Sequence, residues 1–192
     1  GSGSITGIAR VTAYTSPTVV SAAVLRNFGG TTSTDEWAEG AWSDRRGWPS
    51  AVAIHEGRLW WAGKDSMRGS ISDAFHSFDA DTEGDSGPIS RSIGSGPVDS
   101  INWLLPLPRL FVGAQGAEIS ARSSSLDEPL TPTNFNLKES STQGSSAVSA
   151  VKIDTSGVFV QRSGTRLYLI SYDAAAYDYG VEDLTVLAPQ VG

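Results

Sequence analysis

The apolar and polar positions of residues 50–63 predict a strand, a tight turn and a second strand. Small and large apolar side chains alternate over 51–54, Glu56 and Gly57 provide a two-residue turn, and residues 59–62 are apolar on both faces. The same design returns at 100–113 and at 149–160. Each second strand has a central aromatic residue, and these recur after 51 and 48 positions: Trp60, Phe111 and Phe159. Such a period is typical of a repeating β unit such as a propeller blade.

Further strand patterns follow each of these hairpins, and no helical stripe of useful length appears. We expect outer strands at 68–72, 88–93, 117–122, 134–139, 165–172 and 177–187. An all-β protein can produce similar hairpins by chance, but three matched turns in register favour a repeat. The prediction is an all-β, β-propeller-like array of about three four-stranded antiparallel blades, at about 49–98, 99–146 and 147–192. Because closed propellers usually have four to eight blades, further blades or other subunits must cover the ends of this arc.

The segments before the repeats have a different character. Residues 1–4 (GSGS) are typical of a cloning scar, which predicts a piece of a longer protein. Residues 5–28 predict a β-hairpin, either the end of a preceding small β domain or an element that docks on the first repeat. Residues 29–48 form a linker with three tryptophans, Trp37, Trp42 and Trp48. We expect these to be covered, either by this chain's own sheets or by a neighbouring subunit.

Composition narrows the classes of function. The 192 residues include no cysteine, which excludes a disulfide framework and any thiolate metal site. The net charge of −7 argues against nucleic-acid binding, because phosphate recognition needs a basic face. No apolar run is long enough to span a bilayer, and no signal peptide is recognisable.

Three short motifs suggest chemistry that the surrounding sequence does not support. Residues 84–88 (GDSGP) resemble the nucleophile segment of chymotrypsin-like proteases, but one glycine is missing, and neither His55 nor His76 has a matching context. We interpret the segment as a polar loop turn. His55 and Glu56 begin a zinc-protease pattern in which Leu59 occupies the place of the second histidine.

The acidic segment 79–85 begins like an EF-hand loop, with Gly84 at the sixth place. The twelfth place is Ser90 rather than a bidentate glutamate, so we prefer a solvated acidic turn and leave a weak calcium site at Asp79–Asp85 open. A propeller glycosidase would need two carboxylates about 5–10 Å apart, which sequence does not reveal. We therefore predict no catalytic residue, no metal ligand and no cofactor, and no enzyme.

Five segments carry a resemblance to a known family. They are 46–63 (RGWPSAVAIHEGRLWWAG), 101–106 (INWLLP), 130–134 (LTPTN), 158–164 (VFVQRSG) and 183–189 (DLTVLAP). In this order and spacing they resemble the tail tubular or nozzle protein of short-tailed bacteriophages and related prophage tail proteins. The resemblance covers most of residues 5–192, and family members are much longer.

The resemblance implies a structural virion component of the phage tail, assembled in the bacterial cytoplasm. Subunits would form a ring, usually a hexamer in the full-length protein, and contact neighbouring tail proteins. DNA would pass through the ring without specific binding, which an acidic lumen favours because it repels phosphate. No membrane is involved. The alternative classes are a carbohydrate- or protein-binding module on the tail and the propeller glycosidase.

Overall fold

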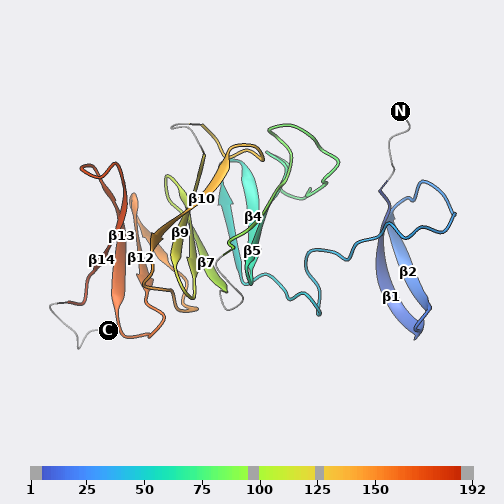
Figure 1. Ribbon diagram of the computed structural model, residues 1–192, viewed down its shortest axis with the longest axis horizontal. Coiled ribbons are helices and arrows are strands. Elements are labelled where there is room, and N and C mark those ends of the chain that lie inside the picture. Colours follow the sequence, from blue (N-terminus) through green and yellow to red (C-terminus); the bar gives the residue numbers. More distant parts are fainter. Residues whose placement is uncertain (1–5, 95–99, 124–127, 187–192) are drawn as a thin grey trace. The chain divides into compact units, whose positions relative to one another are not determined.

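The computed structural model describes residues 6–94, 100–123 and 128–186 (Figure 1). A hairpin is formed by β1 (Ile8–Ser16) and β2 (Val19–Arg26). Sheet 1 holds β3 (Ala51–His55), β4 (Arg58–Gly63), β5 (Ser66–Gly69) and β6 (Ile89–Ser92). Sheet 2 holds β7 (Ile101–Pro106), β8 (Leu110–Ala114), β9 (Glu118–Ser123) and β10 (Phe135–Ser141). Sheet 3 holds β11 (Val151–Ile153), β12 (Ser156–Val160), β13 (Leu167–Asp173) and β14 (Asp178–Asp183).

The predicted fold class is confirmed. Each sheet is an antiparallel meander whose four strands follow chain order, and the described residues form strands and turns without a helix. Figure 1 shows the three sheets side by side in the order of the sequence, as an open array of blades rather than a closed propeller. In the part of the chain that the structure describes, no helix is suited to crossing a membrane.

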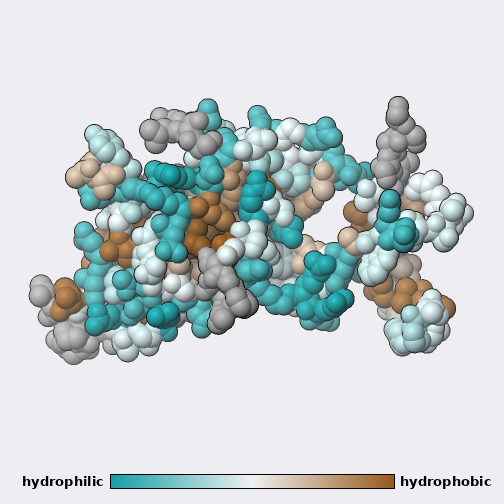
Figure 2. All heavy atoms as spheres, in the orientation of Figure 1, coloured by the Kyte–Doolittle hydropathy of each residue, from teal (hydrophilic) through white to brown (hydrophobic). Residues whose placement is uncertain are grey.

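The hairpin belongs to a separate compact unit, Gly1–Gly40, and the sheets belong to the unit Ala41–Gly192. Its predicted strands are present, and Figure 2 shows hydrophobic side chains gathered on its surface. Val11 is 60% exposed and Tyr14 is 71% exposed. Residues 1–4, the expected scar, lie outside the described residues.

Sheets 1 and 2 pack through one large aromatic side chain of sheet 1, which lies against the aliphatic face of sheet 2. Trp60 on β4 is fully buried and stacks on Phe135 of β10, with ring centroids 5.6 Å apart. Leu110 and Val112 of β8 belong to the same buried cluster. The hydroxyl of Ser50 also donates a hydrogen bond of 2.5 Å to the carbonyl of Ile101. Removal of this apolar surface from water holds the two sheets together.

Sheets 2 and 3 pack through aromatic pairs. Phe111 of β8 meets Tyr179 edge-on at 4.9 Å, and Phe159 of β12 lies 5.5 Å from Trp103 and 5.7 Å from Tyr168. Aromatic pairs in these geometries contribute about 0.5–1.5 kcal/mol each beyond their buried area. The middle sheet is therefore buried on both faces, as the sequence predicts for the second strand of each repeat.

The repeat predicts equivalent surroundings for its three central aromatic residues, and this prediction is wrong. Trp60 and Phe111 face the following sheet, whereas Phe159 faces the preceding one. Successive side chains of a strand point to opposite faces, so an offset of one position reverses the face. The repeat predicts the strands correctly but not which side of the third sheet is aromatic.

Three further expectations need correction. The third strand of sheet 1 begins at Ser66 rather than at 68, because Lys64, at φ 49°, turns the chain directly after β4. The inner hairpins of sheets 1 and 3 are not buried on both faces, because Val52 and Val151 are 52% and 61% exposed. Trp48 is exposed rather than covered by this chain's sheets, and its indole donates to Asp44 at 2.9 Å; Trp37 is exposed within its own unit, Gly1–Gly40.

Asp178 of β14 ties sheet 3 to the outer part of sheet 2. Its carboxylate accepts a hydrogen bond from Arg109 at 2.5 Å and forms an ion pair with Lys138. Burial by itself would raise the pKa of Asp178, but hydrogen bonds from Lys138, the Tyr179 amide and Arg109 lower it to about 2. The folded state thus favours the ionised form of this carboxylate.

We expect Gly113→Ala to destabilise the fold, because a Cβ there would lie 2.0 Å from the Trp103 ring. Overpacking of this kind costs about 1–3 kcal/mol, which urea unfolding measures. The matched control is Gly180→Ala in β14, where an added Cβ meets no atom within 4 Å. Equal stabilities of the two variants would contradict the close packing of Trp103 on β8.

Asp178→Asn should lower the free energy of unfolding by about 2 kcal/mol at neutral pH, given the lowered pKa. Because the folded pKa lies below the unfolded value of 3.8, this contribution is present above about pH 4 and is lost as the pH falls toward 2. Urea titrations of parent and variant between pH 2 and 7 should therefore converge at the acidic end. A difference that does not change with pH would refute the ion-pair explanation. Asp154→Asn, in an exposed turn, is the control.

Candidate functional site

A buried arginine organises the long loop of sheet 1. Arg58, at the start of β4, is 2% exposed, and its Nη1 donates to the carbonyls of Ser70 and Gly87 at 2.6 Å each. Its Nη2 donates to the carbonyl of Asp85, also at 2.6 Å. Burial lowers the pKa of the guanidinium, and the nearby carboxylates of Asp73 and Glu56 oppose that effect. One side chain therefore fixes both ends of the segment between β5 and β6.

The serine-protease-like segment 84–88 is part of this loop. The carbonyl of Ser86 accepts a hydrogen bond from the Ser72 amide at 3.0 Å, and the Gly87 amide donates to Gly84 at 3.0 Å. Gly84 has φ 85°, a conformation that glycine adopts without strain. The segment is thus a turn held by backbone hydrogen bonds and by Arg58.

The acidic segment 79–85 is arranged as turns rather than as a closed shell of ligands. The Asp79 carboxylate accepts the Asp81 amide at 3.2 Å, and the Asp85 carboxylate accepts the Thr133 hydroxyl at 3.3 Å. Among residues 6–94, 100–123 and 128–186, no three acidic or histidine side chains gather where they could hold one metal ion. We derive no metal chemistry from this loop.

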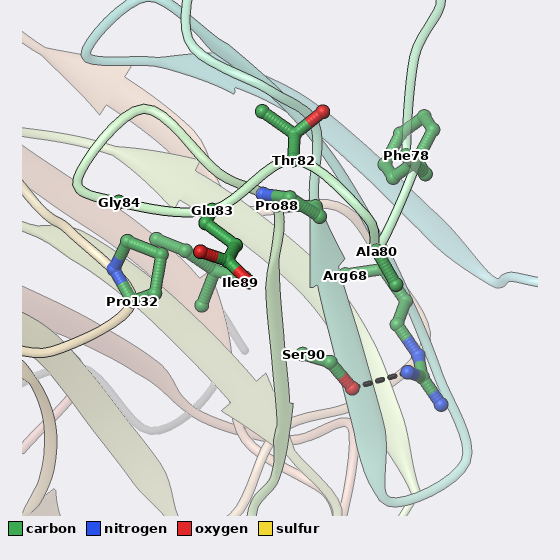
Figure 3. A pocket seen from close by; sticks show the side chains of 10 residues that line it. All are labelled: Arg68, Phe78, Ala80, Thr82, Glu83, Gly84, Pro88, Ile89, Ser90 and Pro132. Carbon is green, nitrogen blue, oxygen red and sulfur yellow. Dashed lines mark hydrogen bonds between the residues drawn. The ribbon is translucent and has the colours of Figure 1, made fainter. Parts of the chain in front are cut away.

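The loop closes over a hollow of about 380 Å³ at the outer edge of sheet 1 (Figure 3). This volume lies in the range of small-molecule sites. The lining residues come from β5, β6, the loop between them and the loop before β10: Arg68, Phe78, Ala80, Thr82, Glu83, Gly84, Pro88, Ile89, Ser90 and Pro132. Apolar side chains and proline rings thus form most of the wall, and a few polar groups interrupt it.

The polar groups of the hollow are an arginine, a carboxylate and two hydroxyls. Arg68 donates a hydrogen bond to the Ser90 hydroxyl, as Figure 3 shows, and its Nε is buried without an acceptor among the described residues. Glu83 is the carboxylate among the lining residues. A mixed wall of this kind can hold a ligand that offers both apolar surface and hydrogen-bonding groups.

The His55–Glu56 pair lies at the end of β3, where sheet 1 meets the loop before β10. His55 is buried, and its Nε2 lies 3.6 Å from the Glu56 carboxylate. The second oxygen of Glu56 accepts the Leu130 amide at 2.7 Å. Burial lowers the pKa of His55; Glu56 opposes this and Lys152 adds to it. The pair therefore joins two sheets, and its geometry is that of a structural contact.

Glu118 on β9 is a second buried carboxylate, fully inaccessible to solvent. One of its oxygens accepts the Ser145 hydroxyl at 2.7 Å. Burial raises its pKa, opposed by hydrogen bonds from Ser145, Ser141 and the amides of Gly144 and Gln143. Glu118 therefore secures the segment that connects sheet 2 to sheet 3.

Sequence reasoning missed the roles of Arg58, Arg68 and Glu118. Each occupies an ordinary position in a strand pattern, so composition and spacing give no signal of its partners. A charged residue between apolar positions of a strand pattern, as Glu118 is between Ala117 and Ile119, is the one available hint.

Two comparisons with known proteins returned no relationship: no family model matches this chain, and no curated protein matches it.

We expect Arg58→Lys to loosen the loop of residues 73–88, because an ammonium cannot reproduce the fork of donors to four carbonyls. Hydrogen bonds to charged groups contribute about 1.5–3 kcal/mol each, so urea unfolding should show a loss of at least this size. Hydrogen exchange should accelerate at the Ser72 and Gly87 amides. Arg162→Lys, at an exposed position, serves as the control. Unchanged protection of both amides would contradict the organising role.

Proposed function

We propose that this chain is a structural part of a bacteriophage tail, a piece of the tube or nozzle subunit that forms the DNA-ejection channel. The work of such a protein is mechanical. Further copies of the full-length protein, arranged in a ring, and neighbouring tail proteins would be its partners.

The observation that carries the proposal is where the family-like segments fall. Residues 46–63 include the whole β3–β4 hairpin, 101–106 form β7, and 158–164 include the end of β12. Residues 130–134 belong to the loop whose Leu130 amide contacts Glu56. The segment 183–189 extends beyond the described residues. The resemblance thus concerns the parts that join one sheet to the next, which are the parts a rigid scaffold depends on.

The chemistry of the chain agrees with this role. Aromatic packing and the Asp178 ion pairs stiffen the sheets against one another, and the Arg58 hydrogen bonds stiffen the long loop of sheet 1. The net charge of −7 suits a channel wall, because repulsion from phosphate lets DNA slide without adhering.

A binding module on the tail is the second candidate, and the hollow beside Arg68 and Glu83 is the observation that favours it. A sugar or a peptide side chain would bring the apolar surface and polar groups that its wall can receive. A glycan array on which Arg68→Ala and the parent give the same blank result would remove the carbohydrate version of this candidate.

The proposal is tested on particles of the virus or prophage that encodes the chain. Antibodies raised against residues 41–192 should decorate the tail in electron micrographs, and the isolated full-length protein should form rings with a central channel. In gel-shift assays the chain should leave DNA mobility unchanged. Particles of an unrelated phage provide the control. Labelling absent from the tail, or full-length protein without a channel, would overturn the proposal.

A further inference from the structure

The two ends of the sheet array carry apolar faces that the described residues of the unit Ala41–Gly192 do not cover. On sheet 1 the outward face presents Val52 and Ile54, which are 52% and 61% exposed. On sheet 3 the outward face presents Val151 and Ile153, which are 61% and 53% exposed. Apolar patches of this kind on a folded chain mark interaction surfaces.

The strand registers order these faces into rows. Across sheet 1, one row runs through consecutive strand partners from β3 to β6: Val52, Trp61, Arg68 and Ser90. Across sheet 3, one row runs from β11 to β14: Val151, Val158, Leu169 and Glu182. We name them the tryptophan row and the aliphatic row. Both are apolar on the inner strands and polar on the outer ones.

An interface of the same chemistry already exists inside the chain. Sheet 2 presents to sheet 1 a row of three aliphatic residues that ends in a glutamate: Leu104, Val112, Ile119 and Glu139. The first three pack with Trp60 in one buried cluster. The aliphatic row of sheet 3 likewise has three aliphatic residues and a glutamate. Trp61, next to Trp60, faces the other side of β4. The outward faces of sheets 1 and 3 thus resemble the two faces that meet between sheets 1 and 2.

Charge supports the same match. Arg68 lies on the third strand of the tryptophan row, β5, and Glu182 lies on the fourth strand of the aliphatic row, β14. Within the described residues Arg68 has no carboxylate partner and Glu182 has no cationic one. Opposite charges on the outer strands of two facing rows would favour one register over the others.

We propose that two copies of this chain join head to tail, with the aliphatic row of each copy seated on the tryptophan row of the other. Three sheets per copy give six in the closed pair, within the usual range of closed propellers. Two identical contacts related by a two-fold axis leave neither end face exposed. This inference goes beyond the proposed role in a tail and does not depend on it.

Sedimentation and light scattering of the full chain test the pairing. The expected species is a discrete dimer of twice the 20.2 kDa chain mass. Val52→Arg and Val151→Arg, each verified as folded by circular dichroism, should raise the dissociation constant at least about a hundredfold, because a charge would face an apolar contact. The matched control is Val148→Arg, which is 58% exposed and lies outside both rows.

Two further variants test the direction of the contact. Arg68→Glu should weaken the dimer, and the double variant Arg68→Glu with Glu182→Arg should restore it. Monomers at all concentrations, open-ended polymers, or a dimer that survives both valine substitutions would each overturn the proposal. These outcomes leave the labelling of phage tails unaffected, so the two ideas fail separately.

Discussion

The packing of aromatic side chains between neighbouring sheets is the interaction on which the rest of the structure depends. A single four-stranded sheet of this length leaves apolar side chains on both faces, and water opposes that exposure. Trp60 of sheet 1 covers one face of sheet 2. On the other face, Phe111 and Trp103 of sheet 2 pack against sheet 3, where Phe159 contacts Trp103. The close fit of Trp103 on Gly113 shows how little free space the arrangement leaves. Packing the sheets on one another thus buries both faces of sheet 2. It leaves one face of sheet 1 and one face of sheet 3 without a neighbouring sheet.

Buried polar groups find their partners in loops and neighbouring sheets rather than in their own strands. Arg58, Glu118 and Asp178 each lie where a loop or a second sheet approaches, and each finds its partners in segments remote in sequence. Buried charges are tolerated because carbonyls, amides or opposite charges surround them. The loop between β5 and β6 is held in this way by Arg58, and the hollow beneath it follows from that anchoring. The candidate binding surface is therefore a consequence of how Arg58 holds this loop.

The open ends connect architecture with assembly. A structural role in a tail requires rigid units that associate, and the rigidity derives from the sheet junctions. Association requires surfaces that remain apolar in the folded chain, and the rows that contain Trp61 and Leu169 supply them. The hydrophobic effect is non-directional, so the charges of Arg68 and Glu182 are needed to select one register among many.

The sequence by itself determined the class of fold, because alternating apolar positions, tight turns and a period near fifty residues each report local geometry. The strands fall close to their predicted positions, and the hairpin and the sheets appear in the predicted order. Only the tertiary structure decided which face of each strand is buried, as the reversal of Phe159 demonstrates, since a shift of one position inverts a strand without altering its pattern. It alone showed which carbonyls Arg58 contacts and which faces of sheets 1 and 3 are uncovered within their unit. Both depend on residues far apart in the sequence, and no local pattern indicates that such residues lie close together.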